Sequence, residues 1–267
     1  YLAGPGVLFG TATTAAFIHL YLPYDWPLLL SVVLGTILAA TDPVAVVSLL
    51  KELGASPILT AQIQGESLLN DGTAIVIFSV CYDMLKGNTY DTTGVALFLV
   101  KTAICAWLLG CVVGGLFVLW IRAASNRHEH TSTMIQISLT LCCAYTSFFL
   151  AEILTMSGVL STVAASLVMA DNMWSSVVDK EAMHEVWGVF EYFANVTIFF
   201  LAGSLTAKSM VEIPYKDYMY LFYLYFVLTM GRLALMMGSR PILQYLSPSR
   251  TPVSKADALV MTWGGLR

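Results

Sequence analysis

The chain is a succession of long apolar runs separated by short polar stretches. A helix needs roughly 20 apolar residues to cross the hydrocarbon layer of a bilayer. Windows of that length predict about nine membrane segments, the last of them cut off at the end of the sequence. They cover residues 3–22, 28–50, 58–85, 95–121, 134–156, 158–173, 186–206, 218–237 and 256–267, with polar connectors at 122–130 and 171–185.

Composition agrees with this pattern. Of the 267 residues, 58% are hydrophobic and only 11% are charged, whereas a soluble domain carries about 25% charged residues. We therefore expect an all-α, multi-pass membrane protein that is embedded in a lipid bilayer and binds no nucleic acid. Because the sequence begins without Met and stops inside an apolar run, we interpret residues 1–267 as one partial transmembrane domain, with further chain on both sides.

The second segment contains a predicted helix break at Thr41-Asp42-Pro43. Pro43 has no N–H to bond the carbonyl of Ala39, and the residue before a proline is pushed away from helical angles. Broken backbone at membrane depth is tolerated only where protein or a watery cavity covers it. Freed carbonyls, the Asp42 carboxylate and the Thr41 hydroxyl would then offer oxygen ligands to a monovalent cation. The alternative is a proline kink whose Asp caps the second half-helix.

The third segment carries polar residues inside its apolar run, in the stretch 65–73 (GESLLNDGT). An acid at the centre of a membrane helix costs about 2.5–3.5 kcal/mol. Asp71 lies near the middle of the segment, so we expect it to lie at a similar depth to Asp42 and to face it. Glu66 precedes Asn70 by one turn and shares its helix face. A low-dielectric site favours a protonated carboxylate, which could exchange its proton for a cation. The alternative is a buried polar cluster that only ties helices together.

These stretches belong to a familiar pattern. Residues 39–47 (AATDPVAVV) and 65–74 (GESLLNDGTA) closely resemble the signature motifs of sodium/proton exchangers of the monovalent cation:proton antiporter-1 family, which includes animal exchangers and plant salt-tolerance antiporters. Further matches are the stretches 150–152 (LAE), 157–160 (SGVL), 194–195 (AN), 199–201 (FFL) and 263–267 (WGGLR), together with Trp187.

The resemblance implies an inverted-repeat cation/proton antiporter fold with an interrupted helix, in which a mobile core domain moves against a dimerisation domain. It implies a homodimeric secondary antiporter that exchanges Na⁺ for H⁺ by alternating access, with Li⁺ or K⁺ as alternative cations. No cofactor is expected beyond the transported ions. The plasma membrane is the expected location, with an endomembrane as the alternative.

The resemblance also implies residue roles. Asp71 would bind both the cation and the proton, and Thr41 and Asp42 would complete the Na⁺ ligands. Ser67 would contribute a hydroxyl nearby, and the neutral Asn70 goes with electroneutral exchange.

Glu66 would form a structural ion pair with Arg267 of the terminal motif. Three further charged residues stay open. Arg232, inside the eighth segment, is expected to pair with a carboxylate or a carbonyl. Glu152 is either part of an ion path or a helix-packing acid. Glu191 lies one turn after the position where Gly188 replaces the acid of the family, and no role is assigned to it.

Other functional classes fit the sequence less well than exchange does. A K⁺-selective exchanger and a cation channel remain alternatives. An intramembrane enzyme would need a Ser–His pair or an HExxH motif at membrane depth. None of the four histidines lies near mid-membrane with a partner, so we do not expect an enzyme.

Gly110, Gly114 and Gly115 in the fourth segment predict close helix contact.

Overall fold

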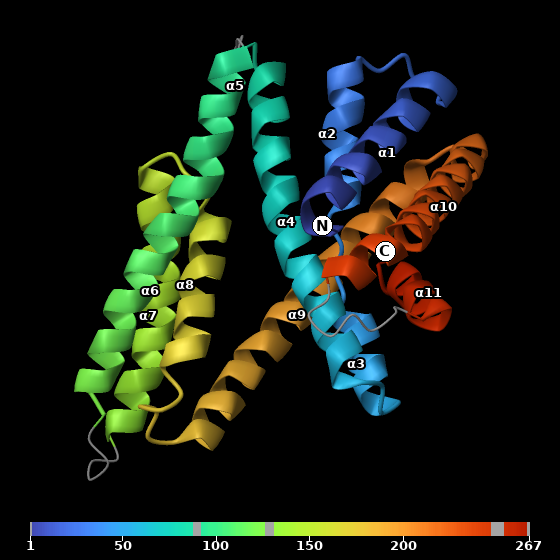
Figure 1. The fold of residues 1–267 in the computed structure, drawn as a ribbon. Coiled ribbons are helices and arrows are strands. Elements are labelled where there is room, and N and C mark those ends of the chain that lie inside the picture. Colours follow the sequence, from blue (N-terminus) through green and yellow to red (C-terminus); the bar gives the residue numbers. More distant parts are fainter. Residues whose placement is uncertain (1, 88–91, 126–130, 247–253, 266–267) are drawn as a thin grey trace. The chain divides into compact units, whose positions relative to one another are not determined.

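A computed structural model of the chain describes residues 2–87, 92–125, 131–246 and 254–265 (Figure 1). Within these ranges the regular structure is helical, and no strand is present. The chain divides into two compact units. One comprises Tyr1–Val95 together with Tyr215–Arg267, and the other comprises Ala96–Pro214.

The first unit joins the two ends of the sequence. Its helices α1, α2 and α4 pack against one another, while α10 and α11 pack on α1 and α4. Val47, Leu50, Ile63, Met236 and Met261 form its buried apolar cluster. The elements are η1 (Leu2–Gly6, a π-helical turn), α1 (Val7–Tyr21), α2 (Leu28–Ala39), α3 (Val44–Glu52), α4 (Pro57–Leu85), α10 (Tyr215–Leu246) and α11 (Lys255–Gly264).

The predicted break in the second segment is confirmed. Helix α2 ends at Ala39 and α3 begins at Val44. Ala40 has extended backbone angles, with φ −68° and ψ 143°. Pro43 directly precedes the new helix, where a residue without an N–H costs no internal hydrogen bond. Two half-helices therefore replace one continuous span, as the Thr-Asp-Pro sequence predicted.

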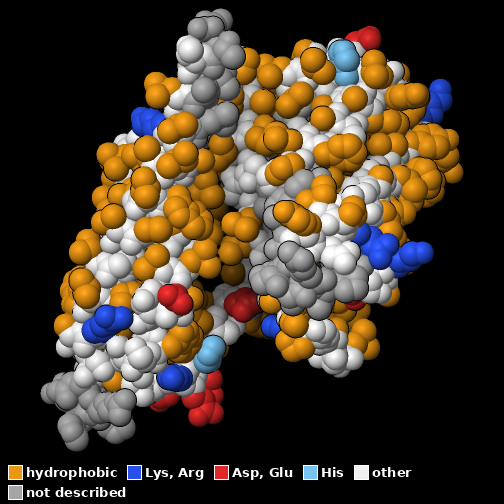
Figure 2. Space-filling model, viewed as in Figure 1, with side chains coloured by type: hydrophobic (Ala, Val, Ile, Leu, Met, Phe, Trp, Pro, Cys, Tyr) orange, Lys and Arg blue, Asp and Glu red, His pale blue; other side chains and the backbone are white. Residues whose placement is uncertain are grey.

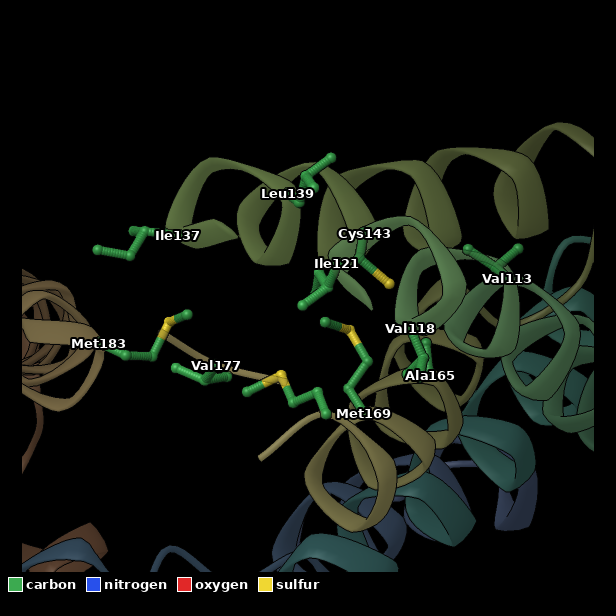
Figure 3. Close-up of a cluster of buried hydrophobic side chains, with 11 residues drawn as sticks. Val113, Val118, Ile121, Ile137, Leu139, Cys143, Ala165, Met169, Val177 and Met183 are labelled. Atoms are coloured by element: carbon green, nitrogen blue, oxygen red, sulfur yellow. The ribbon is translucent and has the colours of Figure 1, made fainter. Parts of the chain in front are cut away.

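The second unit is built around three mutually packed helices, α6, α7 and α8. Figure 3 shows their buried side chains, with Ile121 from α6, Cys143 from α7 and Met169 from α8 among the cluster. The elements are η2 (Val100–Cys105, a π-helical turn), α6 (Ala106–Ala123), α7 (Thr131–Ile153), α8 (Gly158–Asn172) and α9 (Lys180–Glu212); α5 (Thr92–Leu99) lies at the boundary of the two units.

Close approach of α6 to α8 depends on two of the three predicted glycines. A Cβ at Gly110 would overlap the backbone of Ser161, and one at Gly114 would lie 2.7 Å from the carbonyl oxygen of Ala165. The prediction is wrong for Gly115, because nothing lies within 4 Å of the position its Cβ would take.

Two helices are longer than the hydropathy windows predicted. Helix α9 begins at Lys180, so the predicted connector 171–185 is wrong from that residue onward. Asp179 caps the helix by accepting a hydrogen bond from the Ala182 N–H at 3.0 Å, which makes polar residues compatible with a first turn. Helix α10 continues to Leu246 and includes Pro241.

Five of the described helices are long and apolar enough to cross a membrane. They are Pro57–Leu85, Val100–Ala123, Thr131–Ile153, Lys180–Glu212 and Tyr215–Ile242. Hydrophobic side chains are spread across the face that Figure 2 shows, with few charged side chains among them. Because exposed apolar surface of this extent requires lipid or protein cover, the chain is part of an integral membrane protein.

Candidate cation site

The helix break and the polar stretch of α4 meet in the first unit. The Ser67 hydroxyl donates a hydrogen bond to the backbone carbonyl of Thr41. Both residues are buried, with 3% and 5% of their surfaces exposed. The carbonyl belongs to the non-helical residues between α2 and α3, which lack the regular hydrogen bonds of a helix. The two motifs that the sequence singled out are therefore in direct contact.

Asp42 occupies a different environment from its neighbour Thr41. Its side chain is exposed, and its Oδ1 accepts a hydrogen bond from the Val44 N–H at 3.0 Å. This is the capping arrangement that the sequence allowed as an alternative to ion binding, since it satisfies one of the free N–H groups at the start of α3. A role of Asp42 as a cation ligand stays a prediction.

Glu66 forms a buried ion pair across the first unit. Its Oε1 lies 3.0 Å from the guanidinium nitrogen Nη2 of Arg232 on α10, and the side chains of Glu66 and Arg232 are 5% and 15% exposed. The same nitrogen donates to the carbonyl of Met261 on α11 at 3.1 Å. Arg232 therefore joins three helices. Gly265 leaves room for it, because a Cβ there would overlap the guanidinium.

The expectation that Arg232 pairs with a carboxylate or a carbonyl is confirmed, since it does both. The specific partner of Glu66 was missed. The predicted partner, Arg267, lies outside the described residues, so that pairing stays a prediction. The sequence signalled only that Arg232 needs a polar partner, because Arg232 is the only charged residue in the predicted span 218–237. A buried cation requires a buried anion.

A cavity of about 200 Å³ lies beside this ion pair. Apolar residues of α1 and α10 form much of its wall, and Thr41, Glu66, Asn70 and Arg232 contribute polar groups. Among the described residues, Oε2 of Glu66 and Oδ1 of Asn70 are buried and have no hydrogen-bond partner. Because buried acceptors are costly when unsatisfied, these two oxygens suit water molecules or a cation inside the cavity.

Asp71 is half-buried on α4 and is not among the residues that line this cavity. The structure thus brings Thr41, Ser67, Glu66 and Asn70 together, but it does not bring Asp42 and Asp71 to the cavity wall. The roles of all these residues in ion binding stay predictions. Across the described ranges, no cluster of three or more His, Cys, Asp or Glu side chains is placed to hold a metal ion.

Glu152, whose role the sequence left open, makes a packing contact between two helices. Its Oε1 accepts a hydrogen bond from the Gly158 N–H at 3.0 Å. Gly158 is the first residue of α8, where a carboxylate is favoured by the free N–H groups and the helix dipole. The observed contact is the one expected of a helix-packing acid.

Comparison with known proteins gives a consistent result. The model of the sodium/hydrogen exchanger transmembrane family matches residues 1–267. Sodium/hydrogen exchanger 8 of Arabidopsis thaliana is 35% identical over 274 residues, which cover 100% of this chain and 35% of that protein. Sodium/hydrogen exchanger 7 of the same plant is 34% identical and is covered to 23%.

A bacterial relative is also similar. The low-affinity Na⁺/H⁺ antiporter NhaS1 of Synechocystis is 30% identical over 237 residues, covering 86% of this chain and 43% of that antiporter. The chain therefore spans less than half the length of these relatives.

Proposed function

This chain belongs to the sodium/hydrogen exchanger transmembrane family, and from that premise we propose that the full-length protein exchanges Na⁺ for H⁺ across a membrane. The relatives named as exchangers and antiporters support this activity. The proposal refers to the whole protein, because the chain spans 35% of its plant relative. Transport is by alternating access, in a homodimer located in the plasma membrane, with an endomembrane as the alternative.

One observation carries the proposal, namely the hydrogen bond from Ser67 to the Thr41 carbonyl. It holds the interrupted helix against the helix that bears Asn70 and Asp71. Transporters use such breaks because unwound carbonyls can replace part of the water around a cation. A broken backbone inside a membrane span is tolerated only where protein or a water-filled cavity covers it. The break therefore favours a transport role over helix packing alone.

In this proposal, Asp71 couples the movement of Na⁺ to the movement of H⁺. The same carboxylate binds either Na⁺, together with Thr41 and Asp42, or a proton, so the two ions compete for it. A low-dielectric surrounding favours whichever positive partner neutralises the carboxylate. Because Asn70 beside it is neutral, one positive charge is carried in each direction, and exchange is electroneutral.

The first prediction tests this role. We expect Asp71→Asn in the full-length protein to abolish Na⁺-dependent proton movement in proteoliposomes that contain a pH-sensitive dye, because the amide cannot take up a proton. Thermal unfolding in detergent should stay close to that of the parent protein. Substantial exchange by a folded Asp71→Asn protein would contradict the proposed site.

The same proteoliposomes test the rest of the proposal. Saturable flux that requires a pH gradient is expected, whereas unsaturated flux without one would indicate a channel. A series of Na⁺, Li⁺ and K⁺ should show the highest rate with Na⁺, and a preference for K⁺ would indicate the alternative exchanger. Rates that respond to an imposed membrane potential would contradict electroneutral exchange.

A further inference from the structure

Helix α9 carries an acid that the proposed site does not use. Glu191 is the only charged residue between Glu185 and Lys208. The uninterrupted helix between those two residues is about 33 Å long at about 1.5 Å per residue, which is close to the thickness of the hydrocarbon layer. Glu191 lies about 8 Å from the midpoint of that interval. By length and composition, Glu191 therefore falls inside the part of α9 that would cross the hydrocarbon layer.

The contacts of α9 with α7 fix the direction in which Glu191 points. Met183 is buried, and the Trp187 indole N–H donates to the Thr140 hydroxyl of α7 at 3.1 Å. Trp187 therefore marks the side of α9 that faces α7. At about 100° per residue, Glu191 lies about 40° around the helix from Trp187, and Asn195 lies about 40° further on. The acid and the amide form one polar stripe that borders the packed side.

This polar stripe is uncovered within the second unit. Glu191 is exposed and Asn195 is half-buried. Among the described residues, none forms an ion pair or a hydrogen bond with the Glu191 carboxylate. A charged acid that faces lipid at this depth is strongly disfavoured. Such an acid is retained where it faces water or a polar partner.

We propose that the polar stripe of Glu191 and Asn195 faces a water-filled path in the assembled exchanger, and that the Glu191 carboxylate attracts the transported cation into this path. The inference rests on the proposed exchange function. A fixed negative charge beside a path bounded by low-dielectric walls raises the local concentration of cations. It acts on cation entry and takes no part in the exchange of the proton at Asp71.

The transport test separates entry from turnover. In the full-length exchanger at low ionic strength, Glu191→Gln raises the apparent KM for Na⁺ by about 3- to 10-fold and leaves the maximal rate within about 2-fold. The increase shrinks at high ionic strength, because salt screens the charge. Glu191→Asp keeps the parent KM. The matched control is Glu185→Gln on the exposed first turns of α9, which changes neither value. An unchanged KM in Glu191→Gln overturns the proposal.

A labelling test does not depend on transport. In the full-length protein with its five cysteines replaced by serine, Glu191→Cys reacts with a charged, membrane-impermeant thiol reagent. Val189→Cys is the matched control, because Val189 is exposed but lies about 160° around α9 from Glu191. It does not react. Failure of Glu191→Cys to react overturns the water-filled path, whereas labelling of Glu191→Cys in a protein without exchange activity would leave the path intact and contradict only the proposed function.

Discussion

At the residue scale, the pair of Glu66 and Arg232 holds the first unit together. The two residues are 166 positions apart in sequence, and Arg232 also bonds the carbonyl of Met261. Removing one partner leaves the other charge buried without a counter-charge, which destabilises the folded protein by about 3–5 kcal/mol. We predict that Arg232→Ala lowers the free energy of unfolding by about that amount, measured by thermal unfolding of the full-length protein in detergent.

The control for this prediction is Lys208→Ala, a change at an exposed cation on α9, which should alter stability by less than about 0.5 kcal/mol. Glu66→Gln should also destabilise the protein. The double variant should lose less than the sum of the two single variants, because each single change already abolishes the pair. Strictly additive losses would show that the two side chains do not interact.

At the element scale, Ser67 links α4 to the break between α2 and α3. We predict that Ser67→Ala lowers stability by about 1–3 kcal/mol, because the buried Thr41 carbonyl loses the donor that the structure gives it. The Na⁺-dependent exchange rate should fall as well, since the break would no longer be held against α4 by this hydrogen bond. Both are measured on the full-length protein, by thermal unfolding and in proteoliposomes.

Ser79→Ala provides the matched comparison for Ser67. The Ser79 hydroxyl donates to the Ile75 carbonyl of its own helix at 2.8 Å. That carbonyl keeps its backbone partner, so the loss should stay below about 0.5 kcal/mol. If Ser67→Ala and Ser79→Ala behaved alike in both stability and exchange, the contact between the two motifs would have no special role.

The packing of α6 on α8 gives a second prediction at this scale. We predict that Gly110→Ala destabilises the protein by about 1–3 kcal/mol, because the added methyl would overlap the Ser161 backbone. Gly115→Ala is the control on the same helix, with nothing within 4 Å of the new methyl. It should raise stability by about 0.5–1 kcal/mol, since alanine favours the helix. Thermal unfolding that ranked the two variants in the opposite order would contradict the observed packing.

At the scale of the whole molecule, the division into two units bears on alternating access. The family resemblance implies that a core domain moves as a body against the rest, and the candidate site lies entirely within the first unit. Helices α1 and α10 of that unit come from opposite ends of the sequence. A Cβ at Gly231 would lie 3.7 Å from the Thr13 hydroxyl oxygen, so these two positions are direct neighbours.

We predict that a disulfide between Thr13→Cys and Gly231→Cys leaves Na⁺/H⁺ exchange at half or more of the parent rate. The reason is that both positions belong to the first unit, which moves as one body in the mechanism that we propose. The full-length protein with its other cysteines replaced by serine is compared before and after oxidation, with Thr13→Cys alone as the control. A loss of exchange on oxidation that a reductant reverses would show that the first unit changes shape internally during transport.

The helical segments and the helix break follow from local features of the sequence. Helix α4 was predicted over 58–85 and spans Pro57–Leu85, because the length of an apolar run is a local property. The break before Pro43 is equally local, since it follows from the missing N–H and from the angles that proline forbids. The start of α9 was misjudged because polar residues after Asp179 were taken as a connector, although a capped first turn accommodates them.

Which residues meet became clear only from the folded structure. Hydropathy placed Arg232 inside a span without indicating that Glu66 is its partner, and it did not distinguish Gly110 from Gly115. It left Asp42 between ligand and cap, and in the structure its carboxylate caps α3. The physical reason is that apolar length and periodicity fix where each helix lies along the chain. The rotation and neighbours of a helix depend on side-chain packing between segments that are far apart in the sequence.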